Sequence, residues 1–364
     1  MFCIGAYNSL DCFGIGVNVV RLVEPYEGFQ VGAVEYLLKE EYDVVGLYLK
    51  MHPWAEDLTL LKQECEKLDI PLFTKDVSEA FSKRVIAPFT AAYLKGQTPN
   101  VCTICNSVLK LPSLFEFADQ KGIEKVATGH YAKLIYRKGK PLLQLAADKW
   151  KDQSYMLYRL QSRQLSRLVL PLGDKSKETI KQYARQRGFE KTAAQRESFG
   201  LCFTAGRSYK DYLIEHYPEL KRLENGMVID TCRKPIGTHQ GYPFYTIGQW
   251  KGLETKEKKY VLDILPQTNT IVAGTKAECF KQSLVISELC VHQAELLERK
   301  ESLVVKIRGK DEGTQGHISL LPPKEGSPQC AKVEFAQPVF APMRGQDVVA
   351  YSQDETIVIG GRIV

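Results

Sequence analysis

Two closely spaced cysteines are the residues whose types and spacing best suit chemistry. Cys102 and Cys105 lie in the segment Gly96–Asn106, where Pro99 and Asn100 indicate a turn just before the first thiol. A C-x-x-C spacing suits a redox pair, half of a metal site, or a nucleophile with a helper. A closed zinc site needs two further ligands, and no second C-x-x-C or H-x-x-x-H pattern follows, which argues against structural zinc. Because buried cysteines usually occupy apolar elements, the polar turn also argues against a chance pair.

Three further segments carry residue types that suit a site. Cys202 lies among aromatic residues, and it gains a chemical role only if the fold brings it to Cys105. Gly129 and His130 follow a predicted strand, where α/β folds bind ligands. Lys149–Tyr155 is a basic and aromatic cluster at the start of a predicted helix, which suits phosphate contacts and base stacking. The competing interpretation of each is structural: a core cysteine, a core histidine and a helix start with its cap.

The elements that must position these residues alternate between strand and helix in the first half of the chain. Strands are expected at 19–23, 43–50, 71–74, 125–128 and 133–136. Helices are expected at 31–39, 58–68, 77–93 and 114–121. Such alternation is typical of an open, mostly parallel sheet with helices on both faces. The predicted fold class is therefore α/β.

The pattern changes in the second half, where short β-rich runs are separated by Gly, Pro and Asn. Strands are expected at 228–230, 260–264, 270–273, 303–307, 331–335, 347–351 and 356–364. This spacing predicts a small antiparallel barrel or sandwich. We therefore expect three domains: an α/β domain at 1–205 that carries the candidate catalytic residues, a small central domain at 206–274, and a β-domain at 275–364.

Charge is distributed unevenly along the 364 residues. The net charge is +6, but residues 133–210 hold 18 Lys and Arg against 6 Asp and Glu. This basic block predicts a surface for a polyanion, most often nucleic acid, although a solvated lysine-rich face is the alternative. Apolar runs are far shorter than a membrane span, and the first twenty residues lack the basic start of a signal peptide. With no secretion signal, the ten cysteines predict a cytoplasmic protein with mostly reduced thiols and no membrane partner.

Taken together, these motifs resemble the bacterial tRNA-specific 2-thiouridylase family, whose members thiolate the wobble uridine of certain tRNAs. The resemblance runs from about Val19 to Val364 and rests on separate segments that occur in the family's order. These segments are 42–47, 96–106, 127–131, 151–158, 201–203 and 237–249. The resemblance implies an adenine-nucleotide-hydrolase (PP-loop ATPase) domain, a small central domain and a C-terminal antiparallel β-barrel.

The resemblance also implies a reaction. In the family, ATP adenylates O2 of the target uracil, and a cysteine persulfide then delivers sulfur to C2. A second cysteine attacks the persulfide, which releases the product and leaves a disulfide. By position in the motifs, Cys105 matches the nucleophile and Cys202 the persulfide carrier. Cys102, the third candidate catalytic residue, falls where family members have Asp or Cys. The expected partners are tRNA and a persulfide sulfur donor, either a desulfurase or a relay protein.

Further positions match family residues that contact tRNA. They are Asn100, Val101, His130, Lys151, Asp152, Gln153, Arg308 and Gln346. Among them, Asn100 and Val101, together with Cys102, would line the flipped target base. The three cysteines also admit a second interpretation, in which Cys102, Cys105 and Cys202 hold a [4Fe–4S] cluster with one iron open for sulfide. We rank the persulfide interpretation first.

The nucleotide site departs from the family pattern. The nucleotide-binding positions implied by the resemblance are Leu49, Gly129 and the loop formed by Tyr26, Glu27, Gly28, Phe29, Gln30 and Val31. The family's loop reads Ser-Gly-Gly-Val-Asp-Ser, whereas here a single glycine remains and Glu27 adds a negative charge where phosphates bind. ATP and Mg²⁺ are the cofactors that the resemblance implies. The alternative function is a tRNA-binding relative that no longer adenylates and acts as a sulfur carrier or accessory partner; ATP binding discriminates between the two.

Overall fold

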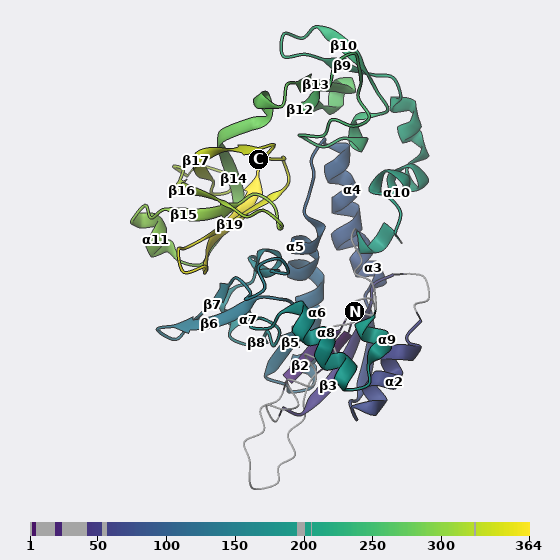
Figure 1. Ribbon diagram of the computed structural model, residues 1–364, viewed down its shortest axis with the longest axis vertical. Helices are drawn as coiled ribbons and strands as arrows, with labels where there is room; N and C mark the ends of the chain where they lie inside the picture. The colour runs from purple at the N-terminus through teal and green to yellow at the C-terminus, as the bar shows by residue number, and fades with distance from the viewer. Residues whose placement is uncertain are drawn as a thin grey trace. The chain divides into compact units, whose positions relative to one another are not determined.

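The computed structural model describes residues 2–4, 19–23, 42–52, 57–194, 201–204, 206–323 and 325–364. The chain divides into two compact units (Figure 1). The first combines Met1–Val85 with Cys102–Phe199, and the second combines Ile86–Val101 with Gly200–Val364. The helix expected at 31–39 lies outside the described residues.

A six-stranded sheet forms the centre of the first unit. Its order is β4 (Leu72–Asp76), β3 (Val44–Lys50), β1 (Phe2–Ile4), β2 (Val19–Val23), β5 (Lys125–Thr128) and β8 (Leu168–Val169). The pairs β3–β4, β2–β5 and β5–β8 are parallel, as the alternation of strand and helix predicts. Only β1, which was not predicted, pairs antiparallel with both of its neighbours, β2 and β3. Five strands therefore run in one direction and end at a common carboxyl edge.

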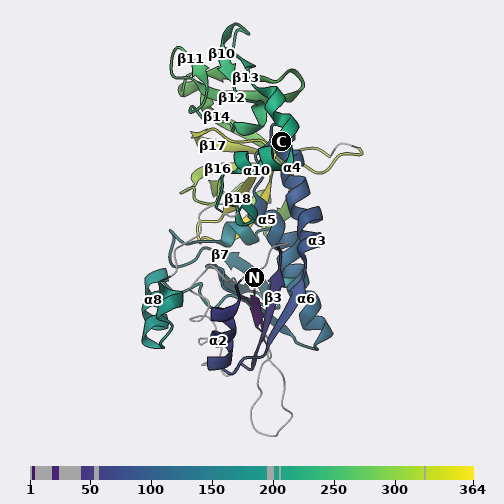
Figure 2. The same ribbon diagram turned by 90° about the vertical axis from the view of Figure 1, so that its right-hand side faces the viewer.

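The α-helices of the first unit include one long helical stretch. They are α2 (Thr59–Lys67), α3 (Ser78–Phe81), α5 (Val101–Cys105, its first residue in the second unit), α6 (Leu111–Gln120), α7 (Ser162–Leu165), α8 (Lys177–Gln186) and α9 (Glu190–Ala193). By length and composition Val101–Gln120 resembles a membrane span, but 61% of its most apolar window is buried, as in a core helix. Accordingly α6, which is labelled in Figure 2, packs against β2 and β5. It ends before Gly122, whose φ of +68° suits a helix C-terminus.

Two shorter features of the first unit matter for the site. The strands β6 (Lys133–Arg137) and β7 (Lys140–Gln144) form a separate antiparallel hairpin. The π-helical segment η1 (Ser82–Ile86) interrupts the helix predicted at 77–93, and the π-helical segment η2 (Asn106–Lys110) precedes the helix predicted at 114–121. The short 3₁₀-helix η3 is formed by Ser154–Leu157.

The second unit contains the helices α4 (Ala87–Leu94) and α10 (Tyr209–His216) and an open five-stranded sheet. Helix α4 begins next to Pro88, which is favoured in a first turn. The sheet has the order β11 (Glu254–Thr255), β10 (Pro235–His239), β9 (Gly226–Ile229), β13 (Thr270–Gly274) and β12 (Tyr260–Leu265).

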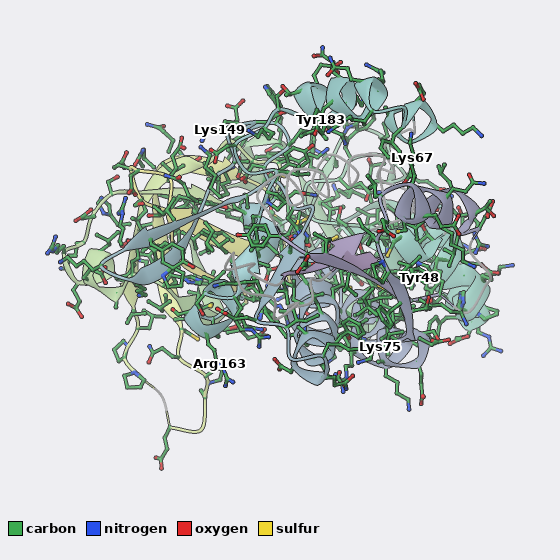
Figure 3. The ribbon with its side chains drawn as sticks, turned by 90° about the horizontal axis from the view of Figure 1, so that it is seen from below. Tyr48, Lys67, Lys75, Lys149, Arg163 and Tyr183 are labelled. Carbon is green, nitrogen blue, oxygen red and sulfur yellow. The ribbon has the colours of Figure 1, made fainter. Side chains whose placement is uncertain are left out.

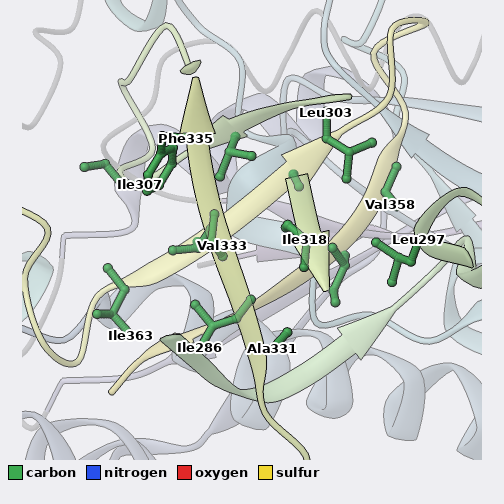
Figure 4. Close-up of a cluster of buried hydrophobic side chains, with 14 of the residues drawn as sticks. Ile286, Leu297, Leu303, Ile307, Ile318, Ala331, Val333, Phe335, Val358 and Ile363 are labelled. Atoms are coloured by element: carbon green, nitrogen blue, oxygen red, sulfur yellow. The ribbon is translucent and has the colours of Figure 1, made fainter. Parts of the chain in front are cut away.

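The second unit ends in a closed antiparallel barrel, which confirms the barrel that the resemblance implies. Its order is β14 (Phe280–Val291), β17 (Ala331–Phe340), β16 (Thr314–Leu320), β15 (Leu303–Lys306), β18 (Asp347–Tyr351) and β19 (Ile357–Ile363). Alternate residues such as Ala331, Val333 and Phe335 of β17 fill its core (Figure 4). The short helix α11 (Ala294–Glu298) adds Leu297 to the same core.

Lys67 at the end of α2 ties that helix to the end of α8. Its Nζ donates hydrogen bonds to the carbonyl oxygens of Arg187 and Gly188, at 3.0 and 3.1 Å, and lies 4.2 Å from the ring centre of Phe189. Lys67 is labelled in Figure 3. The ammonium group thereby satisfies carbonyls that a helix terminus leaves open. In the preceding turn of α2, burial raises the pKa of Glu64 to about 7, although Lys67 opposes the shift.

We expect Glu64→Gln to stabilise the protein at alkaline pH. A raised carboxyl pKa means that the folded state holds the proton more tightly than the unfolded chain. The resulting contribution of Glu64 to the free energy of unfolding is present below the unfolded pKa and is lost as pH rises through about 7. Glutamine stays neutral, so at pH 8 the variant should gain on the order of 1 kcal/mol, a value reduced for partial exposure. Thermal unfolding between pH 5 and 8 measures this. The control is Glu66→Gln, which changes an exposed residue of the same helix. Parallel curves of Tm against pH for E64Q and wild type would contradict the expectation.

Candidate active site

Cys102 and Cys105 lie at the start of the long helical stretch, just before its π-helical segment. Cys102 is exposed, whereas Cys105 is buried, with 3% of its surface accessible. Residues 97–100 are irregular, and the assigned turn lies at Lys95 and Gly96 rather than at the predicted Pro99 and Asn100. The segment η2 begins directly after Cys105. Because π-helical segments are rare and frequently mark functional sites, this position agrees with a chemical role for the C-x-x-C pair.

Asn106, the residue after Cys105, fixes the tautomer of His130. Its Nδ2 donates to the carbonyl oxygen of Met156 at 3.1 Å and lies 3.3 Å from Nε2 of His130. The bond to a carbonyl oxygen requires the amide nitrogen at this position, so Nε2 of His130 accepts. Nδ1 of His130 then carries the proton and donates to Oγ1 of Thr128 at 2.9 Å. Both ring nitrogens are thus engaged, and the orientation of the His130 ring is fixed.

The other end of the Asn106 amide is an unsatisfied acceptor. Asn106 is 3% exposed, and among the described residues its Oδ1 has no hydrogen-bond partner. A buried carbonyl oxygen without a partner calls for a donor such as a water molecule or the N–H of a bound base. Sequence reasoning placed Asn106 inside the cysteine motif but gave it no role. The one sequence feature that could have indicated a role for Asn106 is its place directly after Cys105.

Asp152 and Gln153 stabilise the loops beside His130. The backbone N–H of Tyr131 donates to Oε1 of Gln153 at 2.9 Å, and the N–H of Gln153 donates to the carbonyl oxygen of Tyr131 at 2.7 Å. The carboxylate of Asp152 accepts the N–H of Ala146 at 2.8 Å and the hydroxyl of Ser154 at 2.9 Å. Through these bonds the two side chains position the segment that carries Lys151, which is half-buried.

The described nucleotide-binding candidates share the carboxyl edge of the sheet. Leu49 is the penultimate residue of β3 and is buried, while Gly129 directly follows β5 and is half-buried. At the same edge Lys50 donates to Asp76 at 2.8 Å, and this bond together with those from Ser78 lowers the pKa of Asp76. The remaining nucleotide-binding candidates, namely Tyr26, Glu27, Gly28, Phe29, Gln30 and Val31, lie outside the described residues.

Cys202 belongs to the second unit and opens the short 3₁₀-helix η4 (Cys202–Thr204). Cys202 is exposed, whereas the next residue, Phe203, is buried. The ring centre of Phe203 lies 5.1 Å from that of Phe89 and 5.0 Å from that of Tyr212. This aromatic cluster anchors the turn, so that Cys202 stands on a fixed backbone at the surface.

The backbone that leads to Cys102 is anchored within the second unit. The N–H of Thr98 donates to the carbonyl oxygen of Arg344 in the barrel at 2.8 Å. Gly345 has a φ of +84°, and a Cβ there would lie 3.0 Å from Cβ of Gln97. The hydroxyl of Tyr242 donates to the carbonyl oxygen of Leu94 at 2.8 Å, at the end of α4. The barrel and the central sheet therefore hold the approach to the cysteine motif.

The remaining tRNA-contacting candidates also lie in the second unit. Asn100 is half-buried and Val101 is buried. Arg308 donates to the carbonyl oxygens of Phe340 and Ala341, at 3.1 and 2.5 Å. Gln346 is half-buried, and its Oε1 accepts the N–H of the next residue at 3.3 Å. His130, Lys151, Asp152 and Gln153 by contrast belong to the first unit.

The characteristic segment 237–249 has a structural role at His239. Nδ1 of His239 accepts the N–H of Gly241 at 3.0 Å, so Nε2 carries the proton and donates to the carbonyl oxygen of Asn269 at 3.1 Å. Burial lowers the pKa of His239. A Cβ on Gly226 would approach the His239 ring to 2.2 Å, which explains the glycine. Within the described ranges, no group of three or more His, Cys, Asp or Glu side chains is arranged to hold a metal ion.

Comparison with known proteins covers nearly the whole chain. Family models match residues 19–206 (tRNA methyl transferase HUP domain), 210–275 (tRNA methyl transferase PRC-barrel domain) and 281–364 (aminomethyltransferase beta-barrel domain). The chain is 39% identical to tRNA-specific 2-thiouridylase MnmA of Nitratiruptor sp., over 88% of this chain and 91% of that protein. It is 35% identical to tRNA-specific 2-thiouridylase MnmA 1 of Clostridium tetani, over 93% and 94% of the two chains.

Proposed function

The chain belongs to the tRNA-specific 2-thiouridylase family, and from this premise we propose that it transfers sulfur to C2 of a uridine in tRNA. The observation that carries the proposal is the match along almost the entire chain, combined with cysteines at 102, 105 and 202 in the matched segments. ATP with Mg²⁺ is the activating co-substrate of this reaction. The tRNA substrate makes the cytoplasm the proposed compartment.

The proposed chemistry divides between two cysteines. Adenylation of uracil O2 releases pyrophosphate and makes O2 part of a leaving group. The terminal sulfur of a Cys202 persulfide attacks C2, and AMP departs. The Cys105 thiolate then attacks Sγ of Cys202, which breaks the S–S bond and releases 2-thiouridine, while a Cys105–Cys202 disulfide forms. A thiol reductant and a persulfide donor restore Cys202 for the next turnover.

The positions of the other residues support their proposed roles. Leu49 and Gly129 lie at the carboxyl edge of the sheet, where α/β folds bind nucleotides, and the loop 26–31 follows β2 in the sequence. His130 is held in a fixed orientation between Thr128 and Asn106, and we propose that it contacts the RNA. We propose Asn100, Val101, Lys151, Asp152, Gln153, Arg308 and Gln346 as further tRNA contacts. We also propose the division into domains 1–205, 206–274 and 275–364, which the matched ranges support.

Binding of Mg-ATP is the first test of this function. We expect calorimetry on the purified protein with unmodified tRNA to detect a single nucleotide site with an affinity in the micromolar to millimolar range of typical enzyme substrates. Incubation with a persulfide donor should then yield 2-thiouridine, measured by mass spectrometry of nucleosides. Absence of ATP binding with tRNA present would contradict the adenylating function and favour a sulfur carrier or accessory partner.

A further inference from the structure

Trp150 leaves an unusually large apolar surface in water. Its side chain is 85% exposed, the highest value among the large hydrophobic residues that the structure describes. Indole rings are large, and they normally bury most of their area. The two chain neighbours of Trp150 are lysines, of which Lys149 is exposed and labelled in Figure 3. An exposed ring between two cations suits a partner with flat, apolar and negatively charged parts.

The turn that carries Trp150 is closed by its own backbone. The N–H of Lys151 donates to the carbonyl oxygen of Asp148 at 3.1 Å, so Trp150 is the third residue of a four-residue turn. Just before the turn, the N–H of Ala147 donates to the carbonyl oxygen of Gly173 at 2.9 Å. The ring is therefore presented from a defined backbone.

Both carboxylates beside the ring are engaged within the chain. Oδ2 of Asp148 accepts the N–H of Lys177 at the start of α8, at 3.2 Å. The carboxylate of Asp152 accepts from Ala146 and Ser154, as described above. These bonds fix the turn on both sides, and they direct the negative charges to backbone and hydroxyl donors. A preorganised turn loses little conformational entropy when a ligand binds.

We propose that Trp150 stacks on an unpaired nucleotide of the tRNA, with Lys149 and Lys151 contacting the adjoining phosphates. The proposal rests on the proposed function, which supplies the RNA. Single-stranded RNA is recognised mainly by stacking of splayed bases on aromatic side chains, next to cationic phosphate contacts. The basic block from 133 to 210, with 18 Lys and Arg against 6 Asp and Glu, supplies the charge complementarity.

The test compares stacking with charge at the same turn. Trp150→Leu keeps apolar bulk but removes the aromatic face, so we expect tRNA affinity to fall about tenfold with an unchanged dependence on salt. Trp150→Phe should restore most of the affinity. Lys149→Glu should also weaken binding, and it should reduce the slope of log affinity against log salt by about 1. Binding of Trp150→Leu at wild-type affinity would overturn the proposal.

Trp250 offers a matched control in the second unit. Its ring is 44% exposed, and Nζ of Lys258 lies 4.1 Å from the ring centre, so the protein already provides the cation for this face. We expect Trp250→Leu to bind tRNA like wild type. Stacking of a base on Trp150 should quench tryptophan fluorescence when tRNA binds. We expect this quenching to persist in Trp250→Phe and to be lost in Trp150→Phe. Full retention of the quenching in Trp150→Phe would refute stacking. Wild-type protein that binds tRNA but never thiolates it would overturn the proposed function and leave the stacking result standing.

Discussion

Replacing Cys105 or Cys202 with serine is expected to abolish tRNA thiolation. A serine hydroxyl neither accepts a persulfide sulfur nor attacks an S–S bond, so each change removes an obligatory step rather than a contact. Residues that act as a unit in covalent catalysis give losses of at least about a thousandfold when either is removed. The measurement is the amount of 2-thiouridine formed by purified protein with Mg-ATP, tRNA and a persulfide donor. Binding of tRNA should stay within a few-fold of wild type.

Two other cysteines serve as controls for these variants. Cys65→Ser makes the same change at a buried helical cysteine, and Cys232→Ser makes it at an exposed one. Both should thiolate tRNA like wild type, while thermal unfolding reports any loss of stability. Wild-type activity in either Cys105→Ser or Cys202→Ser would contradict the proposed mechanism.

Cys102→Ser distinguishes the persulfide mechanism from an iron–sulfur cluster. Under the persulfide mechanism Cys102 lines the target base but carries no sulfur, so the variant should keep most of its activity. A cluster held by all three cysteines would instead lose an iron ligand, and activity should then fall as far as in the other two variants. An absorbance scan and an iron assay after anaerobic purification also distinguish the two mechanisms, and they need no measurement of thiolation activity.

The fold could be predicted where the sequence pattern is local. The continuous apolar run of β3 predicts a strand covered on both faces, and the strand β17 alternates between core and solvent as a barrel strand should. The prediction missed the strands β1, β7, β8, β10, β11, β14 and β16. β1 has three residues and depends on partners from two other strands, whereas β16 carries glycine and polar residues in its first half. Such strands are specified by pairing with distant segments, which a linear pattern does not contain.

The candidate site was predictable as a list of residues but not as an arrangement. Spacing identified Cys102 and Cys105, and the family resemblance identified Asp152 and Gln153. The sequence did not reveal that the side chains of Asp152 and Gln153 accept hydrogen bonds from the backbone of Ala146 and Tyr131, because those contacts depend on how separate loops fold back. The tautomer of His130 likewise follows from Asn106, which lies 24 residues earlier in the chain.

Gly173 connects the two loops of the first unit that the proposals concern. Its carbonyl oxygen accepts the N–H of Ala147, which precedes the Trp150 turn. On its other side, an added Cβ would lie 2.3 Å from the carbonyl oxygen of Ala132 and 3.1 Å from Cα of Lys133. These are backbone atoms at the end of the Gly129–His130 loop. They have no side-chain rotation with which to relieve the contact, so one methyl group must displace the backbone.

We therefore expect Gly173→Ala to lower both stability and function. Forced backbone displacement in a buried position costs about 2–4 kcal/mol, which corresponds to a fall in Tm of roughly 5–10 °C. Well below that Tm, tRNA affinity and thiolation should each fall at least about tenfold, because His130 and Trp150 shift together. The measurements are thermal unfolding, tRNA binding and 2-thiouridine formation, with hydrogen exchange at 130–133 and 146–152 to locate the displacement.

The control for Gly173→Ala is the same substitution at Gly122. A Cβ there meets nothing within 4 Å, and the φ of +68° leaves only the conformational penalty of alanine in the left-handed region. That penalty is about 1–2 kcal/mol, so Gly122→Ala should lower Tm by only a few degrees and leave tRNA affinity and thiolation unchanged. If the two variants behaved alike, the contact with Ala132 would not determine the loop positions. A loss of function confined to Gly173→Ala would instead show that both loops depend on the space that this glycine leaves.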